Sequence, residues 1–502
     1  MTQKRERLTI VFISLILSIG FILLFSATTS PLYVANGQDS CGYIMMGTEI
    51  VDGIPMYSQI SDNKGPVMWL LEAAGQFLVR GRVGVIFVQI PLLFLDLILL
   101  GYGCRKLWKL SWKQQVFLEV IFLICLQMWY QRGNLTEEYS IFFIILSFYQ
   151  YARLHKNIHT YKSAALVFGI SFTGVLLIRM NDVLSICVFG LFAFVLLIAS
   201  DKQKWLKHAG IFILYFILGV SAVILPIYFY YSSNGIWGRM LEEYIGVGTG
   251  YAGNNMSFLD GAVTRLKLIL VDPRKYIVIG IAIIALFCNK DSRVQEKNMR
   301  LLLLLIPCSM ILASVVKPML FLHYCMPLSI SIVLSAGYLM KEQSMQYIRE
   351  HKKVIVSVLG IVAVAVILFA GYESATTTVG YLVGNRGDQR YQDMQEAAGA
   401  IPDEEWNQGF TFSTPLWYIA TDTKPSIGYV WTDTLMYREN LKRKFEEELP
   451  ENPPRWLVFF FDQDFNETIK LYQFSEETEH FFYENYYLEK ENDTVTLYRL
   501  KE

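Results

Sequence analysis

The chain has 502 residues, of which 53% are hydrophobic and only 18% are charged, and its formal net charge is −1. Soluble globular domains carry nearer a quarter of charged residues, so this composition favours a membrane protein. The near-zero net charge gives no sign of a nucleic-acid partner. The seven cysteines are scattered without a C-x-x-C pair, which argues against a disulfide framework or a cysteine-rich metal site.

The apolar residues gather in runs long enough to cross a bilayer, for which a helix needs about 20 apolar residues. The first run follows MTQKRER and lacks a small-residue cleavage pattern, so we expect a retained span rather than a signal peptide. The sequence therefore predicts an all-α, polytopic helical bundle of about eleven spans. The predicted spans are 8–28, 83–103, 114–130, 138–152, 163–178, 183–200, 208–230, 276–289, 301–316, 319–340 and 354–372.

Basic residues are unevenly distributed between the loops. The segments 105–113, 202–207 and 290–300 are rich in Lys and Arg, whereas the intervening, longer loops hold fewer. Because cytoplasmic loops concentrate Lys and Arg, we expect a multi-pass protein of the cell membrane with a cytoplasmic N-terminus. An odd number of spans then places the polar tail outside the cytoplasm, together with the loops 29–82 and 231–275.

The first outer loop predicts two helices lying in the plane of the membrane interface. SCGYIMMGTEIVDG and PVMWLLEAAGQFLV each group apolar residues at helical spacing and are too short to cross. In the hinge SDNKGP between them, Pro66 suits a first helical turn and Gly65 permits a bend. Lys64, near that helix N-terminus, could bind a phosphate. The alternative is that Lys64 only reaches toward lipid headgroups.

Several acids and bases are predicted to meet at the outer membrane level. Asp39 lies in the first loop, and Glu137 and Glu138 open the helix after the third span. Each of these glutamates alone could simply favour the helix macrodipole. Arg179, in the turn RMND, is expected at the same height. Ionisable groups at such a rim are costly and tend to be functional.

Two acids lie inside predicted spans rather than at the rim. Asp96 and Glu119 could form a proton or ion path across the bundle. Hydrogen bonds between neighbouring helices are the favoured interpretation for both.

A series of short motifs resembles the GT-C superfamily of integral-membrane glycosyltransferases. The motifs are G-x-P-x-Y at 53–57, N-K-G-P at 63–66, G-R-V-G at 81–84, G-N-L-T-E-E-Y at 133–139 and H-Y-x-x-P at 323–327. Over about residues 1–372 the chain is similar to the bacterial branch of protein O-mannosyltransferases and the lipid A aminoarabinose transferase. The hinge reads K-G-P where that family has H/K-P-P.

The resemblance implies a glycosyltransferase that moves a sugar from a polyprenyl-phosphate donor to an extracytoplasmic acceptor, with inversion. The acceptor could be a protein, a lipid or a cell-wall glycan. The implied catalytic residues are Asp39 as base and Glu137 or Glu138 as second acid. The implied donor-phosphate residues are Lys64, His323 and Tyr324, and Arg179 fits that role by position.

The remaining site predictions concern sugar or acceptor contacts and metals. Asp62 and Tyr57 of the first loop, with Trp237 and Tyr251 of the loop 231–275, are expected to touch the sugar or the acceptor, since aromatic rings stack on sugars. Three acids could hold a divalent cation, but no metal site and no cofactor are predicted.

The composition becomes soluble after residue 372, which predicts two domains, 1–372 in the membrane and 373–502 outside it. YQDMQEAAGAI and TLMYRENLKRKFEEELP read as helices, GFTFSTPLWYIA as one or two strands, and RWLVFFFD as a buried strand. YYLEKENDTVTLYRL alternates about a turn and predicts a hairpin. This small α/β domain is expected to cap the outer cavity, to bind the acceptor, or only to stabilise the protein.

Two other classes of function remain open from the sequence. A lipid-linked oligosaccharide flippase or secondary transporter would show paired repeats with broken helices near the midplane. No convincing internal repeat is present, and the ionisable residues gather at the outer rim. A non-catalytic scaffold of envelope assembly is the third class.

Overall fold

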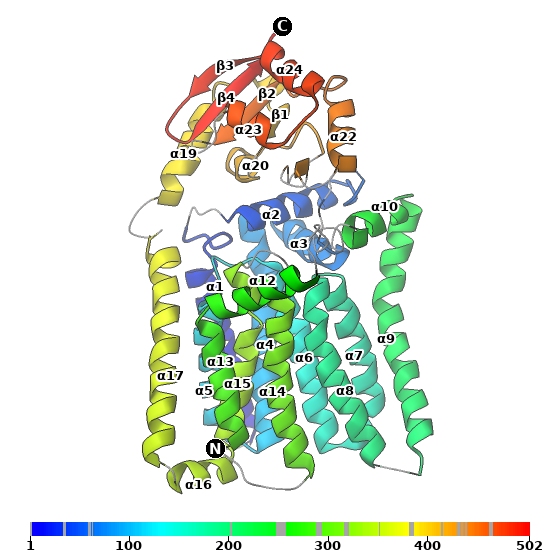
Figure 1. The fold of residues 1–502 in the computed structure, drawn as a ribbon, viewed down its shortest axis with the longest axis vertical. Helices are drawn as coiled ribbons and strands as arrows, with labels where there is room; N and C mark the ends of the chain where they lie inside the picture. Colours follow the sequence, from blue (N-terminus) through cyan, green and yellow to red (C-terminus); the bar gives the residue numbers. More distant parts are fainter. Residues whose placement is uncertain are drawn as a thin grey trace.

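The computed structural model arranges the chain in three levels (Figure 1). Long helices form a bundle, short helices lie across one end of it, and a small α/β part with the C-terminus sits on those short helices. The structure describes residues 3–33, 37–58, 62, 64–200, 203–246, 258–287, 294–315, 321–350, 352–380, 386–412, 415–428, 432, 435–436, 439–460 and 465–502.

A helix lies at each of the predicted spans. In chain order these helices are α1 (Gln3–Phe25), α4 (Ile86–Trp108), α5 (Trp112–Gln127), α6 (Thr136–Lys156), α7 (Tyr161–Leu176), α8 (Val183–Ser200), α9 (Trp205–Ser233), α13 (Arg274–Phe287), α14 (Val294–Val315), α15 (Leu328–Leu339) and α17 (Lys352–Glu373). In the described part of the chain, seven helical segments are long and apolar enough to cross a membrane. The total of eleven spans therefore stays a prediction.

The bundle is held by close backbone approaches and by hydrogen bonds between helices. A Cβ on Gly169 of α7 would lie 2.1 Å from the carbonyl oxygen of Phe216 on α9, so only glycine allows this crossing. Glu119 of α5 accepts a hydrogen bond of 2.7 Å from Ser14 of α1, as expected for an interhelical contact. Such contacts replace the hydrophobic driving force that is missing between helices in lipid.

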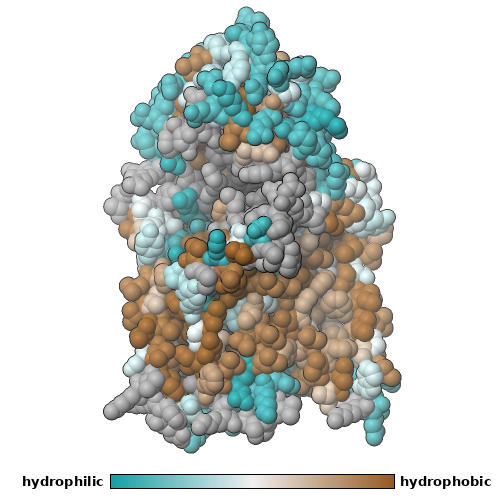
Figure 2. Space-filling view, viewed as in Figure 1, coloured by the Kyte–Doolittle hydropathy of each residue, from teal (hydrophilic) through white to brown (hydrophobic). Residues whose placement is uncertain are grey.

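The outer face of the bundle is strongly apolar. Figure 2 shows a brown belt around the long helices, with hydrophilic surface over the C-terminal part and at the opposite end. Exposed side chains of the belt include Phe12, Leu214 and Ile361. Soluble monomers rarely expose apolar patches of this extent, so the belt supports a multi-pass membrane protein.

The short helices of the middle level confirm the predicted pair in the first loop. α2 (Gln38–Val51) and α3 (Pro66–Leu78) pack against each other, with Pro66 in the first helical turn. α10 (Trp237–Leu241) lies at their height, and α12 (Phe258–Val271) crosses the end of the bundle slightly below them (Figure 1). Further short elements are η1 (Arg82–Val85), η2 (Ile158–Thr160), η3 (Met180–Asp182), η4 (Glu242–Gly246), η5 (Leu322–Cys325), α16 (Glu342–Glu350) and η6 (Ser374–Val379).

The C-terminal part contains a four-stranded sheet of order β1-β2-β4-β3. β1 pairs parallel with β2, and the predicted hairpin is the antiparallel pair β3 and β4, with a bulge between Leu488 and Lys490. β2 and β4 pair antiparallel. The bounds are α19 (Arg386–Ala398), η7 (Asp403–Glu405), β1 (Gly409–Thr411), α20 (Leu416–Thr421), α22 (Glu439–Glu448), β2 (Trp456–Phe460), α23 (Phe465–Leu471), α24 (Glu476–Asn485), β3 (Tyr486–Glu491) and β4 (Val495–Leu500).

One secondary-structure prediction in this part is wrong. The segment LWYIA, expected to continue a strand, is the helix α20. Pro415 precedes it with φ −66°, a value already suited to a helical start. A short apolar run has no periodicity that separates a strand from a buried helical turn, so the sequence could not decide between them.

Candidate functional site

Tyr43 of α2 is the side chain about which the predicted site residues gather. It is fully buried, and burial holds the pKa of its phenol well above the usual value. The charges of Asp39 and Asp62 raise that pKa further, whereas the charge of Arg179 lowers it. These three groups come from three separate segments of the chain, so all lie within electrostatic reach of one ring.

Lys64 lies at the same ring. Its Nζ is 5.6 Å from the centroid of Tyr43 and 3.3 Å from Oδ1 of Asp62. Tyr57 is fully buried and supports the hinge, because its hydroxyl donates a hydrogen bond of 2.5 Å to the Lys64 carbonyl. The same hydroxyl accepts a hydrogen bond of 3.0 Å from Trp69. The lysine is therefore attached to a rigid support, which is what a defined anion site needs.

Gly65 acts differently from the sequence expectation. Its backbone is extended, with φ −82° and ψ 159°, a conformation open to any residue. A Cβ there would lie 2.1 Å from the Leu177 carbonyl oxygen, so glycine is required for close approach rather than for a bend. Val67 donates a backbone hydrogen bond of 3.0 Å to the same carbonyl. The hinge is thus joined to the turn that carries Arg179.

Arg179 is a buried cation that contacts residues of two other segments of the chain. It forms an ion pair with Glu137, which is fully buried, and its guanidinium lies 3.9 Å from the ring centroid of Tyr324. Among the described residues, its Nε and Nη2 have no hydrogen-bond partner. A buried guanidinium with open donors, stacked on an aromatic ring, is suited to a phosphate or carboxylate ligand.

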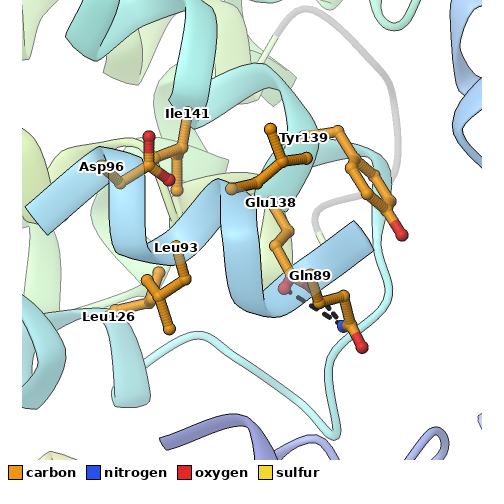
Figure 3. A pocket seen from close by; sticks show the side chains of 8 residues that line it. Gln89, Leu93, Asp96, Leu126, Glu138, Tyr139 and Ile141 are labelled. Atoms are coloured by element: carbon orange, nitrogen blue, oxygen red, sulfur yellow. Dashed lines mark hydrogen bonds between the residues drawn. The ribbon is translucent and has the colours of Figure 1, made fainter. Parts of the chain in front are cut away.

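Glu138 points away from its neighbour Glu137 and has other partners. Its carboxylate accepts hydrogen bonds from Tyr130 at 2.9 Å, from Gln89 at 3.1 Å and from the Asn134 backbone at 2.8 Å. Figure 3 shows Glu138 and Gln89 beside a small cavity that Asp96 also lines. The cavity has room for about one water molecule. Glu138 is therefore held by three donors, and its catalytic role stays a prediction.

His323 and Tyr324 lie together on η5 but serve different neighbours. His323 is buried, and its Nδ1 is 2.7 Å from Oε1 of Gln131. The ring of Tyr324 instead stacks against the Arg179 guanidinium. Gln131 belongs to a turn in which residues 131–134 all have positive φ. Such a run is strained for non-glycine residues. The structure brings Tyr324 to the site directly and His323 through this turn.

Two predicted contact residues are not brought to Tyr43 by any described interaction. Trp237 packs its ring against Tyr228 of α9, with centroids 5.1 Å apart. Tyr251 lies outside the described residues. Their contacts with a sugar or an acceptor stay predictions, as does the sugar contact of Asp62. Among the described residues, no three His, Cys, Asp or Glu side chains converge to hold a metal ion.

Tyr43 and two further buried polar residues were not predicted as site residues. Glu72 of α3 is fully buried, and burial raises its pKa to about 8. Asn134, also fully buried, donates a hydrogen bond of 2.8 Å to Ser40, next to Asp39. The only sequence signal for Glu72 was a single carboxyl in the otherwise apolar stretch PVMWLLEAAG.

The C-terminal part rests on α2, directly above this site. Lys424 forms ion pairs with Asp52 at 2.8 Å and with Glu49 at 3.5 Å, both at the end of α2. Tyr391 of α19 is buried beside Cys41 of α2, with which it shares a hydrogen bond. The C-terminal part therefore covers the helix that carries Asp39 and Tyr43.

Comparisons with known proteins agree with this arrangement at the level of the fold. No family model and no curated protein matches the chain. The crystal structure of ArnT from Cupriavidus metallidurans bound to undecaprenyl phosphate is similar with a TM-score of 0.56, at 10% identity, over 99% of this chain and 98% of that chain. The apo state of the same protein gives 0.54, at 11% identity, over 96% and 97%. The predicted resemblance is confirmed at the level of the fold: the chain has the fold of the ArnT crystal structures.

Proposed function

We propose that the protein is a membrane glycosyltransferase that moves a sugar from a polyprenyl-phosphate donor to an extracytoplasmic acceptor. One observation carries the proposal: Lys64 and the buried Arg179 lie at the same tyrosine as Asp39, at the end of the bundle covered by the C-terminal part. Cations beside a carboxylate suit a reaction in which a phosphate leaves as a hydroxyl is deprotonated. Undecaprenyl phosphate, which is bound in the similar ArnT crystal structure, belongs to the same chemical class as the proposed donor.

The reaction assigns one role to each group. The acceptor hydroxyl oxygen attacks the anomeric carbon, its proton passes to the Asp39 carboxylate, and the bond from that carbon to the phosphate oxygen breaks. The polyprenyl phosphate leaves with the electron pair, and Lys64 and Arg179 stabilise its growing negative charge. A single displacement inverts the anomeric centre.

We assign the role of base to Asp39, which lies near Lys64 and Arg179 at the Tyr43 ring. Glu137 is paired with Arg179, and a carboxylate in a buried ion pair is a weak base. Glu138 accepts three hydrogen bonds. Asp39 lies in the first turn of α2 and is only partly buried. We assign Glu137 the role of orienting Arg179.

Binding of undecaprenyl phosphate to the purified protein tests the anion site. Removing one charge-assisted contact costs about 1.5–3 kcal/mol, so Lys64→Met and Arg179→Met should each weaken binding about 10- to 100-fold. Lys207→Met is the matched control, since Lys207 is exposed at the start of α9. Equal affinity in all variants would refute the site.

Asp39→Asn tests the chemistry separately. The variant should bind undecaprenyl phosphate at least as tightly as wild type but leave the envelope glycan unbuilt in a deletion strain, as measured by mass analysis. A normal glycan in that strain would show that Asp39 is not the base. A flippase would instead move the lipid-linked sugar across vesicles without covalent transfer, which is the outcome that favours the alternative class.

A further inference from the structure

A chain of buried side chains connects α3 to the start of α2 by way of α6. Oε1 of Glu72 lies 3.1 Å from the Tyr139 hydroxyl, and that hydroxyl lies 2.6 Å from Oδ1 of Asn134. Nδ2 of Asn134 lies 2.8 Å from Oγ of Ser40, the residue after Asp39. All four side chains are buried to at least 99%. The chain therefore ends beside the proposed base.

The hydrogen-bonding protons of these four side chains can be counted. In the amide orientation of the structure, Nδ2 of Asn134 donates to Ser40 and Oδ1 of Asn134 faces Tyr139. The Tyr139 hydroxyl has one proton, and the shorter contact sends it to the Asn134 oxygen. The hydroxyl then has only a lone pair left for Glu72. An ionised Glu72 has no proton to offer, so two acceptors would face each other in a buried place.

We propose that Glu72 is a positioning residue held in its acid form: it donates to Tyr139, which donates to Asn134, which holds Ser40 and with it Asp39. This inference deepens the proposed function and rests on it for the role of Asp39. The bonds keep the start of α2 at a fixed distance from the start of α6, where Glu137 holds Arg179. The proposed base and the proposed phosphate cation are thereby fixed relative to each other.

The surroundings of Glu72 favour the acid form. Burial is the largest influence on its pKa, and hydrogen bonding with Tyr139 and Asn134 opposes it without bringing the pKa back to the usual range. The charge of Glu138 on α6 raises the pKa further. The result is a pKa of about 8, so the carboxyl is neutral at pH 7. One oxygen, Oε2, has no partner among the described residues, which also disfavours the ion.

The other elements packed against α3 carry charged groups as well. On α2, Glu49 pairs with Lys424, and Asp39 acts on Tyr43. On η1, Arg82 donates to backbone carbonyls, among them Ser30 at 2.8 Å. On α4, Asp96 lines the small cavity with Glu138 and Tyr139. Among the described residues, no cation is paired with Glu72.

The test uses the full-length protein reconstituted in vesicles that contain undecaprenyl-phosphate-linked sugar. Glu72→Gln keeps an N–H donor for Tyr139 and should retain most of the transfer rate at pH 7. Glu72→Leu removes the donor and should lower kcat about 10- to 100-fold, with undecaprenyl phosphate binding unchanged, because a small misplacement of reacting groups has that cost. Tyr139→Phe should match Glu72→Leu.

The pH profile separates positioning from a merely structural role. Wild-type kcat should fall as pH rises through about 8, because ionised Glu72 no longer donates. That basic limb should be missing in Glu72→Gln. Gln76→Leu is the matched control on the same helix: Gln76 is equally buried but accepts from Gly81 at 2.8 Å, so the limb should remain. A limb unchanged in Glu72→Gln, or full activity in Glu72→Leu, would overturn the proposal.

An infrared measurement distinguishes failure of this inference from failure of the proposed function. The difference spectrum of wild type minus Glu72→Gln at pH 7 should contain the carbonyl band of one protonated carboxyl. If the band is there and wild type transfers no sugar, the proposed function fails while Glu72 is confirmed as an acid. If wild type and Glu72→Gln give the same spectrum, Glu72 is ionised and the inference is refuted whatever the activity.

Discussion

Replacing Gly65 by alanine should disable the anion site without removing any charged group. The added Cβ would lie 2.1 Å from the carbonyl oxygen and 2.3 Å from the carbonyl carbon of Leu177, both backbone atoms that cannot rotate away. Ordinary contact begins at 3.4 Å, so the hinge must retreat by more than about 1 Å. That movement breaks the bond of Val67 to Leu177 and displaces Lys64, which is adjacent in the chain.

The cost of that movement follows from two general magnitudes. Overpacking a well-packed contact costs about 1–3 kcal/mol of stability. A displacement of about 1 Å in a binding or catalytic group can cost about 100-fold in rate. We therefore expect Gly65→Ala to fold with reduced thermal stability, to bind undecaprenyl phosphate at least about 10-fold more weakly and to transfer sugar about 100-fold more slowly.

The control for Gly65→Ala is Gly190→Ala. Gly190 lies in α8, where a Cβ meets nothing within 4 Å, so alanine should be neutral or stabilising there. Thermal unfolding and undecaprenyl phosphate binding are measured on both variants. If Gly65→Ala matches Gly190→Ala in both assays, the hinge does not depend on its contact with Leu177 and the reasoning is wrong.

Two other contacts give separate predictions. Tyr57→Phe leaves the Lys64 carbonyl and Trp69 Nε1 without their bonds, so undecaprenyl phosphate binding should weaken about 10-fold while the lysine itself is unchanged; unchanged affinity would remove Tyr57 from the support of the site. Lys424→Met breaks the ion pairs with Asp52 and Glu49, so limited proteolysis should release the C-terminal part faster than in wild type. An unchanged cleavage rate would show that apolar contacts are sufficient to hold the C-terminal part on α2 without these ion pairs.

The positions of the helices could be predicted from the sequence, whereas the packing environments of Gly65 and Glu72 could not. Apolar runs of spanning length predict helices directly, and Pro66 marks the start of α3. Gly65 has no such local signal, because its neighbour Leu177 is more than 100 residues away in the chain. Glu72 looked like a polar interruption of an interfacial helix, and only the packing of α6 over α3 shows that it is buried.

The partners of the adjacent residues Glu137 and Glu138 also could not be predicted from the sequence. Successive residues of a helix point about 100° apart, so Glu137 and Glu138 cannot share one environment. The motif E-E therefore predicts an acid at the site but not which one. In the structure Glu137 forms an ion pair with Arg179, whereas Glu138 accepts hydrogen bonds from Tyr130 and Gln89. Arg179 and Gln89 are far from the two glutamates in the sequence.

The balance of charges at the proposed site predicts how the spent carrier leaves. The described cations of the site already face carboxylates, since Lys64 lies beside Asp62 and Arg179 is paired with Glu137, and Asp39 acts on Tyr43 in addition. The sugar donor is a phosphodiester with one negative charge, whereas the product phosphate loses a second proton with a pKa of about 6. A site whose cations already face carboxylates disfavours the second charge and favours release of the product.

This charge balance also gives a measurable pH dependence. Undecaprenyl phosphate should bind more tightly at pH 5.5 than at pH 7.5, because its monoanion resembles the donor in charge. Neutralising one acid with Asp62→Asn should reduce the difference between the two affinities. Tighter binding at pH 7.5 in the wild-type protein would mean that the cations dominate the field, and release would then need movement of the C-terminal part away from α2.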